Sequence, residues 1–203
     1  MTESIQWSDP LETLTKEEAE RCLALAWVHE ESQRWCTTWN TNLMFPSIIL
    51  ATFSGAGAIG ADKLLPFEGS QTLVGIVSLV VGTLQTIQNY FGFAKNAEAH
   101  RIASLQYGKL HAQLKTQLSL PRAERKSAED IIEWLQNERD RLVEVVPLIP
   151  IKIKKKFAEQ FGAIQDFAIP SNLSGLSSVF VTKEDFSKPK ISIRLDKRVP
   201  EAK

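Results

Sequence analysis

Apolar residues along this chain are concentrated in two long stretches that contain no charged side chain. The first runs over residues 35–61 and the second over residues 69–94. Each is longer than the roughly 20 residues that a helix needs to cross a hydrocarbon core of about 30 Å. Helices buried in a soluble core usually keep a polar stripe, whereas the centres of these stretches have no ionisable group on any face. The pattern therefore predicts two transmembrane helices rather than two buried core helices.

The flanking segments predict how the rest of the chain is organised. The helix-capping pattern formed by Thr15 and Glu18 precedes a run of apolar residues, so we expect an amphipathic helix over residues 16–41 that leads into the first span. Pro46, at the membrane entry, predicts either a kink or a new helix start. The expected regions are an N-terminal cytosolic amphipathic helix (1–41), a two-span transmembrane hairpin (42–93), a cytosolic helical hairpin with a basic juxtamembrane segment (94–163) and a partly disordered C-terminal tail (164–203).

The cytosolic hairpin is predicted from prolines, a cap and apolar periodicity. No proline follows the second span until Pro121, so we expect this helix to continue beyond the membrane. Ser127 with Asp130 predicts the cap of a return helix. Both helices carry apolar residues at every third or fourth position, as packed helix pairs do. About 25 residues in each direction at about 1.5 Å per residue gives a hairpin roughly 35 Å long, which brings the chain back to the membrane surface.

Charge at the flanks predicts the orientation. The connection between the spans, residues 62–68, is short and net acidic, whereas basic residues predominate over residues 95–115 after the second span. Because positive charge favours the cytosolic side, we expect both termini in the cytosol. Aromatic residues at one end of each span predict a belt at the cytosolic interface, formed by Trp35, Trp39, Tyr90, Phe91 and Phe93.

A basic cluster follows the return helix, after Pro147 and Pro150 break it. Lysines beside a membrane attract anionic lipid headgroups with about 1 kcal/mol each. The alternative is a solvated turn whose lysines only balance nearby acidic residues. The candidate headgroup ligands are Lys152, Lys154, Lys155 and Lys156.

Polar and small residues in both spans recur at three- or four-residue intervals, so they lie along helix faces. In lipid, such groups need a partner helix or water. In the second span they are the candidate pore-lining residues Gly75, Ser78, Gly82, Gln85, Thr86 and Asn89. In the first span they are the candidate helix-packing residues Ala51, Ser54, Gly55, Gly57 and Ala58.

Two spans cannot enclose a channel, so a pore requires a homo-oligomer with the polar face of the second span on its axis. The alternative is that both faces only pack helices together. Without a charged ring in the span, selectivity would depend on residues at the mouths such as Asp62, Glu68 and Lys95.

Other chemistry has little support in the sequence. Cys22, Cys36 and the three histidines lack the spacing of metal ligands or of a disulfide framework. The densest ionisable cluster, around Glu98 and Arg101, has the spacing of a helical ion pair, and no nucleophile with a base, phosphate loop or carboxylate pair is present. We therefore expect no enzyme activity, metal or cofactor.

Several segments together resemble the SLATT superfamily of two-span membrane proteins, particularly its branch in large DNA viruses and algae. The resemblance covers about residues 15–162 and depends on the order of several short motifs. They are Trp27-Val28-His29, NLMFPSIILAT (42–52) with Gly55, residues 75–91 ending in LQTIQNYF, AEAHRIASLQYGKL, and RLVEVVPLIPIKIKKKF.

The resemblance implies a membrane effector, because SLATT domains are proposed to oligomerise and permeabilise membranes, often under control of nucleotide-signalling enzymes. This sequence has no fused nucleotide-synthesising or nucleotide-sensing domain. We expect an all-α membrane protein that forms a homo-oligomeric pore, with membrane lipids and further copies as partners and no nucleic acid. The competing hypothesis is a non-conducting membrane scaffold whose cytosolic helices bind a partner protein, and a third is an accessory subunit of a larger complex.

Overall fold

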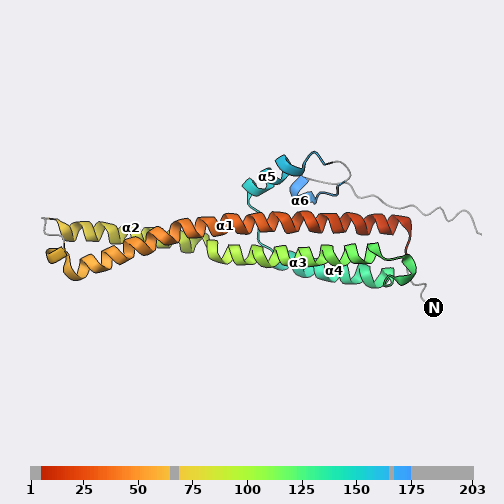
Figure 1. Ribbon diagram of the computed structural model, residues 1–203, viewed down its shortest axis with the longest axis horizontal. Coiled ribbons are helices and arrows are strands. Elements are labelled where there is room, and N and C mark those ends of the chain that lie inside the picture. The colour runs from red at the N-terminus through yellow and green to blue at the C-terminus, as the bar shows by residue number, and fades with distance from the viewer. Residues whose placement is uncertain (1–5, 65–68, 165–166, 175–203) are drawn as a thin grey trace, which may run out of the picture.

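The computed structural model describes residues 6–64, 69–164 and 167–174, and this part of the chain is helical without any strand. Figure 1 shows an elongated molecule in which one long helix, α1, runs along almost the whole length. The predicted all-α class is confirmed for the described residues. The elements are α1 (Asp9–Leu64), α2 (Ser70–Phe91), α3 (Phe93–Ser119), the short 3-10 helix η1 (Arg122–Glu124), α4 (Ala128–Val145), α5 (Ile151–Phe161) and α6 (Ser171–Ser174).

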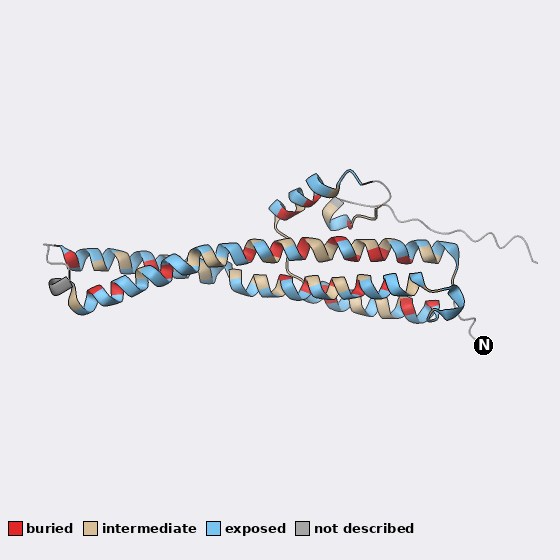
Figure 2. Ribbon diagram, viewed as in Figure 1, coloured by how far each residue is buried: buried red, intermediate tan, exposed pale blue. Residues whose placement is uncertain are grey.

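Two of these helices are long and apolar enough to cross a membrane, as predicted. They pair at one end of the molecule, where the second half of α1 lies against α2 (Figure 1). In the most apolar window of each helix only 11% of residues are buried inside the protein, and Figure 2 shows that most residues along both are exposed. Helices of a soluble core would be mostly buried. We call residues 43–60 of α1 together with α2 the apolar hairpin.

The two helices of the apolar hairpin meet along a regular seam. The least exposed residues of each helix recur at alternating intervals of three and four, which is the spacing of packed, nearly antiparallel helices. Serine and glycine at the centre let the backbones approach closely. The seam consists of Leu43, Ser47, Leu50, Ser54 and Gly57 on α1, and of Ser70, Val74, Val77, Val81, Leu84 and Gln88 on α2.

At the other end, the first half of α1 packs against α3 and α4 in a three-helix bundle (Figure 1). Its core has two layers, and each layer takes residues from all three helices. One joins Cys22, Tyr107, Leu110 and Leu142, and the other joins Ala19, Leu114 and Ile131. The predicted hairpin of α3 and α4 therefore has α1 as a third member.

A further cluster covers the opposite face of α1. Ala24 and Val28 contact Ile153 and Phe157 of α5, and residues 167–173 add apolar side chains. Trp27 packs against the ring of Phe157, with 5.7 Å between the ring centroids. Because helix positions repeat every 3.6 residues, these α1 residues point away from α3 and α4. Thus α1 is enclosed on two opposite faces.

The helix boundaries differ from the prediction in three places. Thr15 does not cap α1, which begins at Asp9; its hydroxyl donates to the carbonyl of Leu11, inside the helix. Pro46 leaves α1 helical, and the non-helical dihedral angles within it are at Gly60. The helix after the second span is broken at Gly92, whose φ of 56° is in the left-handed region that glycine tolerates and that ends helices.

The predicted cap of the return helix is confirmed. Ser127 caps α4, because its hydroxyl accepts a hydrogen bond of 3.1 Å from the amide of Asp130. Aromatic side chains from α1 and α3 meet at the base of the apolar hairpin, where Trp39 stacks on Phe93 and Trp35 packs edge-on against it. We call these residues, with Tyr90 and Phe91, the aromatic belt.

Two predictions concern residues outside the described part. The acidic connection was predicted over residues 62–68, but α1 continues through residue 64, and residues 65–68 lie outside the described part. The side chains of Asp62 and Glu68 therefore receive no placement. The predicted disorder of the tail concerns mainly residues 175–203, which are also outside it.

The seam predicts a sharp difference between two neighbouring glycines. A Cβ atom at Gly57 would lie 2.7 Å from a methyl carbon of Val74, a stiff β-branched side chain, whereas a Cβ at Gly55 would meet nothing within 4 Å. Gly57→Leu should therefore lower the free energy of unfolding by about 1–3 kcal/mol relative to Gly55→Leu. Both variants share the same gain in helix propensity, so their difference isolates the contact.

The measurement is unfolding of the full chain in mixed detergent micelles, followed by circular dichroism. Equal stability of the two variants would contradict the seam.

Candidate functional site

The candidate site is the polar stripe of α2, defined as the predicted pore-lining residues. Each of them is exposed in the protomer. At about 100° per residue the stripe is centred roughly 110° around α2 from the seam, so it lies on the flank of the apolar hairpin. Apart from Ser78, which pairs with Ser54 of α1, the stripe therefore does not make the contact between α1 and α2. Its members are Gly75, Ser78, Gly82, Gln85, Thr86 and Asn89.

Hydrogen bonding divides the stripe in two. The hydroxyl of Ser78 pairs with that of Ser54 of α1 and also donates to the carbonyl of Val74. The hydroxyl of Thr86 donates a hydrogen bond of 2.8 Å to the carbonyl of Gly82. Among the described residues, no hydrogen bond involves the side-chain amide of Gln85 or Asn89. These two amides are thus available to water or to a group outside the protomer.

The glycines of the stripe leave its surface open. A Cβ atom at Gly75 or at Gly82 would meet nothing within 4 Å. Leu73 and Val80, on the other flank of α2, are exposed apolar residues. The helix therefore presents a polar flank, a packed seam and an apolar flank.

The predicted packing residues of α1 are divided between two faces. Ser54 and Gly57 are buried in the seam. Ala51, Gly55 and Ala58 are exposed in the protomer and do not contribute to the seam.

One polar contact of the hairpin was not predicted from the sequence. The amide nitrogen of Gln88 donates to the backbone carbonyl and to the side-chain oxygen of Asn40, both at 3.2 Å. Gln88 occupies a seam position, so the seven-residue spacing of Val74, Val81 and Gln88 was the signal that could have indicated it.

The four lysines of the basic cluster lie on α5 and differ in their contacts and exposure. Lys156 pairs with Glu31 of α1 and lies 5.8 Å from the ring centroid of Trp27, so it takes part in holding α5 on α1. Lys152 and Lys155 are exposed and Lys154 is half-buried. Within the described residues, these three lysines form no ion pair.

A buried histidine pair joins α1 to α3 between the bundle core and the aromatic belt. The Nδ1 atoms of His29 and His100 are 2.8 Å apart, so one neutral ring donates to the other. The side chains are 1% and 2% exposed. His29 also stacks on the ring of Tyr107, with 5.7 Å between centroids. Sequence reasoning missed the pair because its members are far apart in the chain.

The surroundings of the pair favour the neutral form. Burial, followed by the proximity of His100, lowers the pKa of His29 to about 4, and burial lowers the pKa of His100. The nearby hydroxyls of Ser32 and Ser104 donate to the backbone carbonyls of Val28 and Ala26. A charged pair would thus be buried without a compensating carboxylate.

Three other ionisable groups have defined surroundings. Arg101 forms two hydrogen bonds with Glu98, at 2.8 and 2.7 Å, which confirms the predicted ion pair. At the far end of the bundle, hydrogen bonds from Arg122 and Arg125 lower the pKa of Glu12 to about 2. Burial raises the pKa of the Cys22 thiol to about 12, so this sulfur is not a ready nucleophile.

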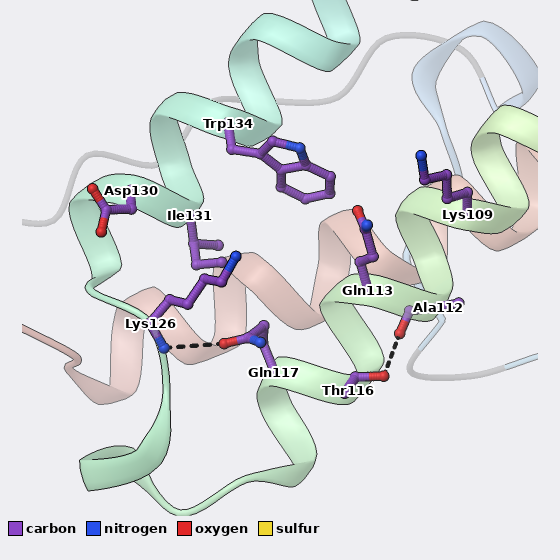
Figure 3. A pocket seen from close by; sticks show the side chains of 9 residues that line it. All are labelled: Lys109, Ala112, Gln113, Thr116, Gln117, Lys126, Asp130, Ile131 and Trp134. Atoms are coloured by element: carbon purple, nitrogen blue, oxygen red, sulfur yellow. Dashed lines mark hydrogen bonds between the residues drawn. The ribbon is translucent and has the colours of Figure 1, made fainter.

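The groove between α3 and α4 offers no reactive set of groups. It has a volume of about 440 Å³, and Figure 3 shows Ile131 and Trp134 on one side with Gln113 and Gln117 on the other. Gln117 accepts a hydrogen bond from the amide of Lys126. This hydrogen bond stabilises the turn between α3 and α4.

No metal site is formed by the described residues, since no three His, Cys, Asp or Glu side chains among them come close enough to hold an ion. Comparison with known proteins identified no matching family, curated protein or solved structure.

The histidine pair predicts a pH-dependent stability. Because the folded-state pKa of His29 is about 4 and its ordinary value is 6.5, the folded state binds fewer protons between these values than the unfolded chain. The contribution of neutral His29 to the free energy of unfolding is therefore fully present above pH 6.5. It is lost as the pH falls toward 4, by on the order of 3 kcal/mol.

Chemical denaturation of the full chain in detergent at a series of pH values measures this loss. Replacing both histidines, by His29→Gln with His100→Gln, should reduce it, whereas His111→Gln is the control for removing a histidine elsewhere on α3. An unchanged pH dependence in the double variant would contradict the role assigned to the pair.

Proposed function

We propose that this protein is an integral membrane protein with both termini in the cytosol, and that copies of it assemble into a pore lined by α2. The observation that carries the proposal is the polar stripe, which contains no charge and is exposed on the flank of a helix otherwise suited to lipid. Amides in hydrocarbon require water or a partner. An axial path filled with water supplies both amides of the stripe with hydrogen bonds.

A homo-oligomer follows from the size of the protomer. One hairpin of two helices encloses no space, whereas a ring of hairpins places one flank of every α2 on its axis. The seam uses a different face of α2, so assembly does not compete with folding of the hairpin. Gln85, Thr86 and Asn89 then surround the path near the aromatic belt, at the cytosolic mouth.

Two further arguments support this proposal. The excess of basic residues after the second span and the aromatic belt favour the cytosolic side for the bundle. The resemblance to the SLATT superfamily implies oligomerisation and membrane permeabilisation. Its viral and algal branch would place the protein in a virion or host membrane.

The second candidate function is a non-conducting scaffold with the same oligomer. Open space at Gly75 and Gly82 favours it, because bare backbone on a helix flank also suits close contact with another helix. In this arrangement the stripe amides bond across subunits and close the axis, and the bundle binds a soluble partner.

Single-channel current from purified full-length protein in planar bilayers, with the oligomeric mass checked in the same detergent, separates the two functions. For a pore we expect discrete conductance steps that change in Gln85→Leu and Asn89→Leu. Gly82→Trp should abolish the current by filling the axis, whereas Val80→Trp, on the opposite flank of the same turn, should leave it.

An intact oligomer that stays silent across voltage, pH and ion conditions would favour the scaffold. Unchanged conductance of an intact Gly82→Trp oligomer would place the stripe away from the axis.

A further inference from the structure

The connection between α4 and α5 exposes large apolar side chains that the bundle leaves uncovered. Leu148 is 96% exposed and Ile151 is 74% exposed. Their neighbours Val146 and Ile149 pack instead against the two clusters on either side of α1. The segment is thus anchored by Val146 and Ile149 and presents Leu148 and Ile151 outward. Such exposure of apolar surface marks a site of contact with something else.

The position of this segment relative to the aromatic belt indicates what it contacts. Lys152 and Ile153, at the start of α5, line the same groove as Trp35 and Thr38. The end of α5 lies farther along α1, where Phe161 contacts Trp27. Helix α5 therefore runs away from the apolar hairpin, and its first residues are at the height of Trp35.

Trp35 belongs to the aromatic belt, and Trp and Tyr concentrate at the boundary between lipid and water. The start of α5 is therefore level with the membrane interface. The exposed side chains of Leu148 and Ile151 lie at the boundary rather than deep in water.

Charge on the same segment fits a surface of anionic headgroups. Lys152 and Lys155 are exposed and, among the described residues, are without ion pairs, whereas Lys156 is occupied by Glu31. Glu159 lines the same groove at the end away from the belt. Exposed apolar residues next to unpaired lysines are the composition of interfacial membrane anchors.

We infer that residues 147–155 form a membrane-docking segment, in which Leu148 and Ile151 insert into the headgroup region and Lys152 and Lys155 bind anionic lipid. The docking depends on the hairpin crossing the bilayer and goes beyond the proposed pore, because it holds whether or not the oligomer conducts. Since α5 is packed on Trp27 and Glu31, the docked segment fixes the bundle relative to the membrane surface.

Depth-dependent fluorescence quenching in the full chain tests this inference. In a Cys22→Ser, Cys36→Ser background, a bimane label is placed at Leu148→Cys or Ile151→Cys, with Gln160→Cys as the control at the far end of α5. The protein is reconstituted in phosphatidylcholine vesicles with or without phosphatidylglycerol, and the quencher is a nitroxide lipid labelled at the headgroup. Circular dichroism checks that each variant folds.

We expect quenching at positions 148 and 151 in vesicles that contain phosphatidylglycerol, and little at position 160. Lys152→Gln or Lys155→Gln should each reduce the ratio of docked to undocked segment about fivefold, the effect of about 1 kcal/mol per lysine. The matched control is Lys115→Gln, on an exposed part of α3 in the bundle, which should have no effect.

Equal quenching at positions 148 and 160 would overturn the docking. Quenching that is unaffected by phosphatidylglycerol and by both lysine variants would overturn the role of anionic lipid. Protection of position 148 from a water-soluble quencher without quenching by the nitroxide lipid would mean that another protein surface covers the segment, which also overturns the inference. Conductance is measured separately, so a failure of the pore is distinguishable from a failure of docking.

Discussion

The architecture depends on the packing of α1 on two opposite faces. Within the bundle, Cys22 and Ala19 contact α3 and α4, and Ala24 and Val28 contact α5. The same helix then continues through Pro46 into the apolar hairpin. Every other helix is positioned by contact with α1 or by a helix that contacts it, so a break in α1 between the bundle and the hairpin would separate the two.

This arrangement places apolar side chains on two opposite faces of α1 in its first half. A helix packed on one side shows one apolar stripe, whereas apolar side chains on two opposite faces leave only narrow polar strips between them. Charged residues occupy these strips in pairs along the helix, as in the bonds of Arg34 to Glu30 and Glu31. Such exposed pairs add little stability, but they keep the strips soluble.

The sequence predicted well those features that depend on neighbouring residues. The two apolar helices, the Ser127 cap and the pair of Glu98 and Arg101 follow from composition and spacing within a few turns. It predicted poorly what depends on contacts between distant segments. The position of α5 on α1 and the pair of His29 and His100 require knowledge of which helices meet, and Thr15 resembled a cap because its spacing to Glu18 is the same inside a helix.

For the candidate site, the sequence could assign the stripe to one face of α2, since periodicity alone decides this. The face of α2 that contacts α1 could not be chosen in the same way, because Val74 and Val81 on one side and Leu73 and Val80 on the other are equally apolar. The structure distinguishes them by burial.

The left-handed residue at Gly92 has a mechanical consequence. Both apolar helices leave the hairpin toward the bundle, but α1 stays helical there, through Pro46, whereas α2 ends at a single glycine before α3 begins. The helical backbone therefore links the bundle to the hairpin through α1, whereas the covalent path from α3 to α2 passes through one non-helical residue, Gly92. The continuous helical connection between the stripe-bearing helix and the bundle is therefore made by its neighbour α1 rather than by its own covalent continuation.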